Sequence, residues 1–180
     1  TGVGFQPDWV WIKNRGASAN HMLYDVARGA TKALFSNATS AENTSSGHLK
    51  SFDSDGFTLG DNSGTGSTNG NTETYTSWNW LAGGSASSNT DGSITSTVSA
   101  NTTAGFSVVS YTGTGSALTC GHGLGAVPQW IIVKDRDASA NWNTYHVGVG
   151  NAKTVQLNLT NAESATSSWN STTPTSSVFS

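Results

Sequence analysis

The sequence is poor in charge, sulfur and proline. Among its 180 residues, 8 are Lys or Arg and 11 are Asp or Glu, with one cysteine, one methionine and three prolines. Without clustered basic residues the chain cannot neutralise a phosphate backbone, so we expect no nucleic acid partner. No apolar run approaches the roughly 20 residues of a membrane span. A single cysteine, Cys120, cannot form a disulfide within the chain, and we expect a buried thiol, with a disulfide between two chains as the alternative.

Good helix formers are also scarce, since the chain has only 9 Leu and 3 Glu. Ser, Thr, Gly and Asn instead make up 89 of the 180 residues. The apolar material is concentrated in 7 Trp, 6 Phe and 4 Tyr, which bury more area per residue than other side chains. This composition excludes a helical bundle and indicates a folded β protein of extracellular type.

Several short segments alternate with period two, which is typical of half-buried strands. In residues 75–81, for example, Thr76, Trp78 and Trp80 share one face. Asp-Gly, Asn-Gly and other turn-forming pairs separate the segments. We therefore predict an all-β fold, an antiparallel β-sandwich of jelly-roll-like type. The expected strands are 9–13, 22–26, 33–36, 49–52, 57–59, 75–81, 94–98, 105–111, 130–134, 144–147 and 155–159.

Residues 22–34 also admit a helix. Gly29 and the β-branched Thr31 disfavour it, and no clear N-cap precedes the segment. We therefore favour a hairpin that turns at residues 28–31.

An internal similarity dominates the sequence. Residues 7–20 read PDWVWIKNRGASAN and residues 128–141 read PQWIIVKDRDASAN, an offset of 121 positions. At this offset, 18 of the 45 residues in 4–48 are identical to those in 125–169 without a gap. We interpret the chain as about one and a half copies of a repeated unit. The expected parts are a first unit over 1–84, a linker and strand over 85–99, and a second unit over 100–180. The segment that looks most like a linker is 83–91.

The similarity also singles out residues by position. Trp9 and Trp130 occupy the same strand position in both copies, so we expect both in the core, with Trp78 and Trp80 in the core or an interface. Lys13, Arg15, Lys134 and Arg136 are repeated too. We expect them to be solvated charges that pair with acids such as Glu42 and Glu163, each pair worth about 0–1 kcal/mol at a surface.

Parts of the sequence resemble repeat units of long tailed-phage and metagenomic proteins, which are classed as tail-fibre or virion structural proteins. The segments that carry the resemblance are GFQPDWVWIKNR, LYDVARGATKALFSN and YTSWNWLAGG, followed by AGFSVVSYTG and GHGLGAVPQWIIVKDR. The resemblance implies jelly-roll-like sandwiches, a location on a virion surface or otherwise outside the cell, and a structural role. It implies no reaction. We accordingly expect a non-enzymatic subunit of a fibre or filament that needs no cofactor.

Candidate binding residues are few. Asp53 and Asp55 open a pattern like that of a calcium loop but lack its closing glutamate, so a plain turn is the alternative. Trp142 between Asn141 and Asn143 is the candidate for stacking on a sugar, which would make the chain a carbohydrate- or receptor-binding module. A glycoside-cleaving jelly roll, the third hypothesis, needs two facing carboxylates. The four histidines are scattered, and no nucleophile–base pair or metal motif is evident.

The two copies are cut out of phase, which suggests how chains assemble. The first lacks a counterpart of strand 105–111, and the second lacks a counterpart of strand 75–81. A sandwich that lacks a strand exposes an edge that can pair with another chain. We expect a head-to-tail homopolymer, or a longer parent chain, with a closed monomer as the alternative. The expected assembly residues are Phe106, Val108, Tyr111, Val178 and Phe179.

Overall fold

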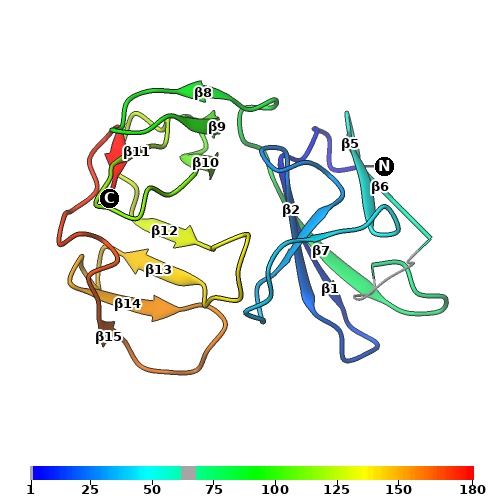
Figure 1. The fold of residues 1–180 in the computed structure, drawn as a ribbon. Helices are drawn as coiled ribbons and strands as arrows, with labels where there is room; N and C mark the ends of the chain where they lie inside the picture. The colour runs from blue at the N-terminus through cyan, green and yellow to red at the C-terminus, as the bar shows by residue number, and fades with distance from the viewer. Residues whose placement is uncertain (1, 62–67) are drawn as a thin grey trace.

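The computed structural model describes residues 2–61 and 68–180, and within them every regular element is a β-strand (Figure 1). All strand pairs within the sheets are antiparallel, so the prediction of an all-β, antiparallel protein is confirmed. The strands are β1 (Trp9–Asn14), β2 (His21–Asp25), β3 (Lys32–Phe35), β4 (Asn43–Thr44), β5 (Leu49–Asp53), β6 (Gly56–Leu59), β7 (Tyr75–Trp80), β8 (Ser87–Asn89), β9 (Ser96–Asn101), β10 (Phe106–Ser110), β11 (Cys120–Gly121), β12 (Trp130–Val133), β13 (Asn143–His146), β14 (Lys153–Gln156), β15 (Ser164–Ala165) and β16 (Val178–Phe179).

Strands β1–β7 form the first lobe. Its main sheet has the order β4-β3-β2-β1-β7, and the β5-β6 hairpin is separate. Because side chains alternate along a strand, Val10 and Ile12 of β1 point to one face and are buried there. They pack with Met22, Tyr24 and further apolar residues of β3 and of the β5-β6 hairpin, which together form the main core of the protein.

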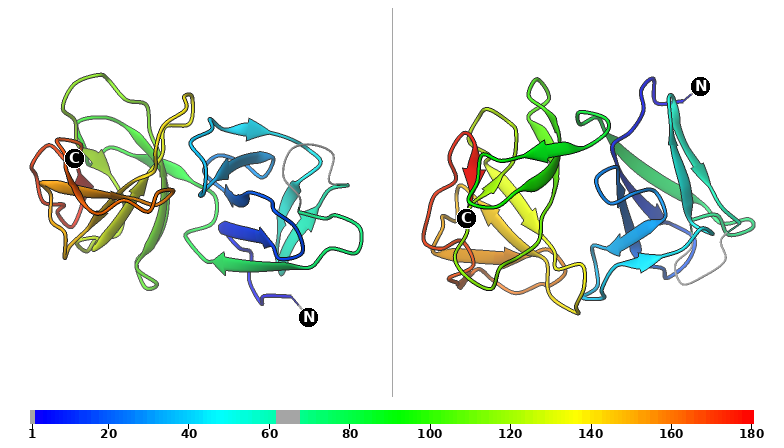
Figure 2. Two further views of the ribbon diagram at one scale, coloured as in Figure 1. Left: turned by 90° about the horizontal axis from the view of Figure 1, so that it is seen from below. Right: turned by 45° about the horizontal axis from the view of Figure 1, so that its top comes forward.

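Strands β8–β16 form the second lobe, which lies beside the first (Figures 1 and 2). It contains the sheets β10-β9-β8 and β12-β13-β14-β15 and the pair β11-β16. Cys120 of β11 is buried and also forms a parallel bridge with Ile94. The two chain ends lie on different lobes (Figures 1 and 2).

Strands β1–β4 of the first lobe and strands β12–β15 of the second lobe pair in the same order and with the same register. β12, β13, β14 and β15 pair in the order of β1, β2, β3 and β4, and each register is displaced by 121 residues. Trp9 lies opposite Asp25, for example, and Trp130 lies opposite His146. The segments with similar sequences therefore form the same antiparallel meander.

The edges of these two meanders differ. In the first lobe β7 pairs with β1, with Trp80 opposite Trp9. In the second lobe β12 is the edge strand of its sheet. Trp130 is 57% exposed as a consequence. The prediction that Trp130 fills a core like Trp9 is therefore wrong, because burial at this position depends on a covering strand.

Residues 22–34, for which the sequence allowed a hairpin or a helix, form a hairpin, so the alternative prediction of a helix is wrong. Gly29 adopts φ of 104° in the turn between β2 and β3, a region that favours glycine. Arg28 closes the hairpin by donating from Nη1 to the Lys32 carbonyl at 2.9 Å and from Nη2 to the Leu23 carbonyl at 3.1 Å. Residues 83–91 were expected to be a linker, but they contain strand β8, which pairs with β9.

Candidate functional site

A cluster of polar contacts joins the two lobes, and we call it the joint. It consists of the loop at 136–142, between β12 and β13, and the segment 35–42, from the end of β3 to just before β4 (Figure 1). Arg136 donates to Glu42 through two nitrogens, from Nε to Oε2 at 2.9 Å and from Nη2 to Oε1 at 3.0 Å. This bidentate geometry makes a strong and directional pair.

Glu42 is held from the first lobe as well. Arg28 Nη1 donates to Glu42 Oε2 at 3.1 Å, and Lys32 Nζ lies 3.8 Å from Oε1. The Glu42 side chain is 12% exposed and that of Arg28 5%, whereas Arg136 is 33% exposed, so the carboxylate is largely buried and differs from the solvated pair expected from the sequence. Burial by itself raises the pKa of Glu42, but hydrogen bonds from Arg136 and Arg28 outweigh it and place the pKa below its ordinary value.

Main-chain contacts extend the joint. The Glu42 amide donates to the Arg136 carbonyl at 2.8 Å, and the Ala140 amide donates to the Thr39 carbonyl at 2.9 Å. The Ser139 hydroxyl donates to Thr39 Oγ1 at 3.0 Å. The loop is therefore fixed to the first lobe along its length, and not by one ion pair.

Trp142 completes the joint, and this corrects its prediction as a sugar-stacking residue. It is only 5% exposed and packs with Leu23 and Leu34 of the first lobe. Its indole Nε1 donates to the Phe35 carbonyl at 2.9 Å and the Ala38 carbonyl at 3.1 Å. A ring buried between the lobes offers no face to a ligand.

The two neighbouring asparagines have other roles. Asn141 accepts a hydrogen bond from Asn158 Nδ2 at 2.9 Å. Asn143 instead lines a cavity of about 500 Å³ in the second lobe, together with Tyr111, Trp169 and Phe179. The structure therefore separates the three residues that the sequence placed in one candidate site.

Four further tryptophans lie on the paired strands β1 and β7, and two of them contact Phe106 of β10. Trp9 contacts Trp80 and Phe106 at centroid distances of 4.3 and 5.9 Å, and both Trp9 and Trp80 are half-buried. Trp78 contacts Trp11 at a centroid distance of 5.7 Å but is 48% exposed on the edge strand β7. The core is therefore wrong for Trp78, and the alternative, an interface, stays a prediction.

The residues expected to assemble with other chains have partners within this one. Phe106 of β10 packs on Trp9 and Trp80 of the first lobe. Phe179 of β16 pairs with β11 and contacts the Tyr111 ring at 6.1 Å. Val108 pairs with β9 and Val178 with β11. These residues therefore have contacts within the chain, but only Phe179 is buried and the other four are partly exposed, so their role in assembly stays a prediction.

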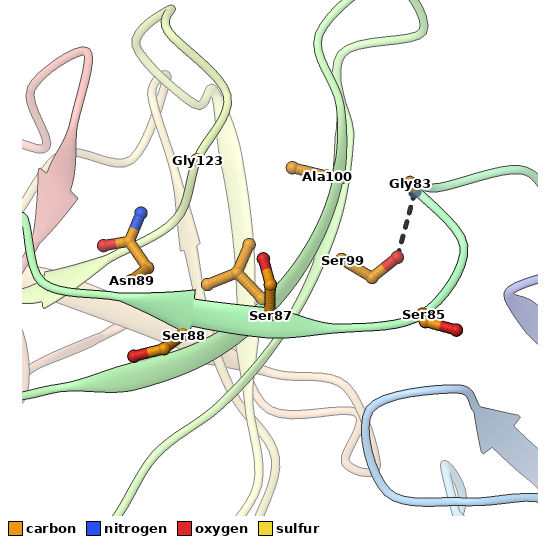
Figure 3. A pocket seen from close by; sticks show the side chains of 9 residues that line it. Gly83, Ser85, Ser87, Ser88, Asn89, Ser99, Ala100 and Gly123 are labelled. Atoms are coloured by element: carbon orange, nitrogen blue, oxygen red, sulfur yellow. Dashed lines mark hydrogen bonds between the residues drawn. The ribbon is translucent and has the colours of Figure 1, made fainter.

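A second hollow, of about 230 Å³, is lined by small polar residues (Figure 3). Ser85, Ser87 and Ser88 lie on or before β8, and Ser99 faces them from β9. The Ser99 hydroxyl accepts a hydrogen bond from the Gly83 amide at 2.9 Å and donates to the Gly84 carbonyl at 2.7 Å. These bonds connect the chain between the lobes to β9, so the hydroxyl has a structural task.

The calcium candidates are engaged by protein donors. Asp53 accepts hydrogen bonds from the Thr58 and Ser51 hydroxyls, which lower its pKa, and Asp55 accepts from the Gly2 and Gly4 amides. No cluster of three or more His, Cys, Asp or Glu side chains suited to a metal occurs in residues 2–61 and 68–180.

Buried titratable groups are structural too. His122 contacts the Thr175 carbonyl at 3.2 Å through Nε2 and accepts from the Leu124 amide at 3.2 Å through Nδ1. Burial raises the pKa of the Cys120 thiol, which disfavours the reactive thiolate. Among the residues that the structure describes, no helix is long and apolar enough to cross a membrane.

The joint was not predicted as a site, although its signal is in the sequence. Arg136 and Glu42 both have identical counterparts 121 positions away, Arg15 and Glu163. Repeated charges of opposite sign indicate a repeated contact. The sequence could not show that one partner comes from each lobe.

The chain belongs to the family described as Domain of unknown function (DUF7483), which it matches over residues 1–180. No curated protein matches the chain, and no solved structure matches it.

Proposed function

We propose that this member of the DUF7483 family is a non-enzymatic structural subunit of a phage-like fibre or extracellular filament. Its two lobes would be successive copies of one jelly-roll-like unit, joined end to end. The observation that carries the proposal is the joint, in which the 136–142 loop of one lobe locks onto the 35–42 segment of the other. A joint of this kind makes a stiff rod from repeated units.

Other features support the proposal. The equal registers of β1–β4 and β12–β15 are those expected of two copies of a unit. The chain is rich in Ser, Thr, Asn and Gly and carries a net charge of −3, a composition that favours a hydrated surface without strong electrostatic fields. The resemblance of the sequence to tail-fibre repeats agrees with a location outside the cell or on a virion.

Electron microscopy of negatively stained protein over a rising concentration series tests this function. We expect linear particles longer than one chain, with a regular spacing along them. Single particles of 18.6 kDa at every concentration, with a matching result from light scattering, would contradict it.

A carbohydrate- or receptor-binding role is the second candidate, supported by the cavity that combines Asn143 with Tyr111 and Phe179. Aromatic rings and an amide in a concave site are groups that bind sugars. A glycan array should then give a signal that Asn143→Ala removes. Signal that persists in this variant would place glycan binding elsewhere.

A further inference from the structure

Each partner in the joint exists twice in the chain. The loop that enters the joint, RDASAN at 136–141, has a counterpart in RGASAN at 15–20. The segment that receives it, NATSAE at 37–42, has a counterpart in NLTNAE at 158–163. In residues 2–61 and 68–180 one loop, 136–141, contacts one segment, 37–42, and the other loop and the other segment do not contact each other.

The unused loop begins with the same turn as the used one, although Lys13 Nζ donates to the Ala19 carbonyl and Lys134 Nζ to the Ala138 carbonyl, which are not at equivalent positions. Asn14 Oδ1 accepts hydrogen bonds from the Gly16 and Ala17 amides at 2.8 and 3.0 Å. At the same place Asp135 Oδ1 accepts from the Asp137 and Ala138 amides at 2.9 and 3.2 Å. The same turn therefore presents Arg15 and Arg136 from the end of their strands.

The unused segment is equally well matched. In the first lobe the Asn37 carboxamide accepts from the His21 amide and donates to Asn20. In the second lobe Asn158 accepts from the Trp142 amide and donates to Asn141. The Ala38 and Leu159 amides close the same turn, by donating to the Phe35 and Gln156 carbonyls at 3.1 Å each.

Both unused elements are exposed. Arg15 forms no ion pair within the part of the chain that the structure describes. Glu163 is 42% exposed and pairs only with the exposed Lys153 there, the counterpart of Lys32 beside Glu42. Leu159 is 41% exposed, whereas Ala38 at the corresponding place packs against the core.

We propose that the 15–20 loop of one chain docks on the 156–163 segment of a second copy of this chain, with the Arg15 guanidinium on the Glu163 carboxylate. The Glu163 amide would donate to the Arg15 carbonyl, and the Ala19 amide to the Thr160 carbonyl. These contacts correspond to those of the joint, with each loop residue replaced by its counterpart 121 positions earlier and each segment residue by its counterpart 121 positions later. The inference rests on the proposed function and names its contact surface.

The contact between chains is weaker than the joint within a chain, for three reasons. Val149 stands where Arg28 supports Glu42, and His21 stands where Trp142 fills the interface. The two lobes of one chain are also tethered, which gives their joint a high effective concentration. Association therefore depends strongly on protein concentration.

The contact uses two different surfaces, so it is heterologous and can repeat without closing. In Figure 1 the loop between β1 and β2 and the loop between β14 and β15 belong to different lobes. A chain can therefore bind one neighbour with its first lobe and another with its second, which yields a linear assembly.

Two alanine variants test the contact by complementation. Arg15→Ala removes the guanidinium but keeps Glu163, and Glu163→Ala keeps Arg15. Each alone should remain monomeric in sedimentation-velocity runs at concentrations where the wild type associates, with its Kd raised at least about tenfold. Mixed in equal amounts, they should form a dimer and nothing larger, since one intact loop meets one intact segment.

Two further variants complete the design. Lys50→Ala removes an exposed positive charge outside both elements and should associate like the wild type. The double reversal Arg15→Glu with Glu163→Arg should restore association that either reversal abolishes. Unchanged association of Arg15→Ala, or no dimer in the mixture, would overturn the contact.

These outcomes are separable from those for the proposed function. Linear particles that persist in Arg15→Ala would refute this contact and leave the fibre function standing. A dimer in the mixture without linear particles of the wild type would support the contact and refute the fibre.

Discussion

Glu42 connects the two lobes, so its charge should contribute far more to the free energy of unfolding than the charge of Glu163, its counterpart in the second lobe. Glu42→Gln keeps the shape and the acceptor oxygen but removes the negative charge between Arg28 and Arg136. Breaking one partner of a buried ion pair costs about 3–5 kcal/mol. Because Asp25 still pairs with Arg28, we expect the lower end, about 3 kcal/mol less free energy of unfolding.

Glu163→Gln is the matched control. Its carboxylate pairs with Lys153 where both side chains are exposed, and such pairs contribute about 0–1 kcal/mol. Urea titrations followed by tryptophan fluorescence, at protein concentrations low enough to keep the chain monomeric, measure both changes. Equal losses in the two variants, or a loss below about 0.5 kcal/mol in Glu42→Gln, would refute the role of the joint.

The same cluster predicts a pH dependence. Burial raises the pKa of Glu42, but Arg136 and Arg28 lower it by a larger amount. The pKa of Glu42 in the folded protein therefore lies below the ordinary value of 4.5. The stabilisation is then complete above the unfolded pKa and is lost as the pH falls through the folded one. The difference in stability between wild type and Glu42→Gln should therefore be constant at neutral pH and shrink in acid. A constant difference down to the acid limit would contradict this assignment.

Three further perturbations follow from burial and close packing. Trp142→Phe removes the indole donor from the Phe35 and Ala38 carbonyls, of which the first keeps the Ala38 amide as a donor, and should cost about 1–3 kcal/mol. Trp130→Phe at an exposed edge should be close to neutral in the same urea titration. A Cβ at Gly60 would lie 2.5 Å from the Gly47 carbonyl carbon, so Gly60→Ala should lower the melting temperature, while Gly113→Ala, with open space around it, should not. Cys120 should react with a thiol reagent only as fast as the protein opens, and fast labelling under native conditions would contradict its burial.

Local chemistry made much of the fold predictable. The period-two segments became strands, and the turn at Gly29 produced the β2-β3 hairpin because a residue there must adopt positive φ. The similarity between 4–48 and 125–169 agrees with the shared pairing order of β1–β4 and β12–β15, but not with the neighbours at the edges of these sets. These features depend on residues close in sequence or on a direct comparison of two segments.

Burial could not be predicted in this way. Trp9 and Trp130 have similar sequence neighbours and the same strand register, yet β7 and Phe106 cover the first while the second lies on an open edge. Trp142 has polar neighbours that suggest a surface, yet it is buried against the other lobe. The environment of each ring depends on a strand or lobe that is distant in sequence.

The joint shows the same division. The sequence by itself determined that Arg15 has an identical counterpart in Arg136, and Glu42 in Glu163, 121 positions away. Only the tertiary structure decided that Arg136 reaches across to Glu42, where Arg28 and the excluded solvent strengthen the pair. Identical residues have different energetic roles here because the strength of an ion pair depends on its burial and its neighbours, which the packing of the two lobes decides.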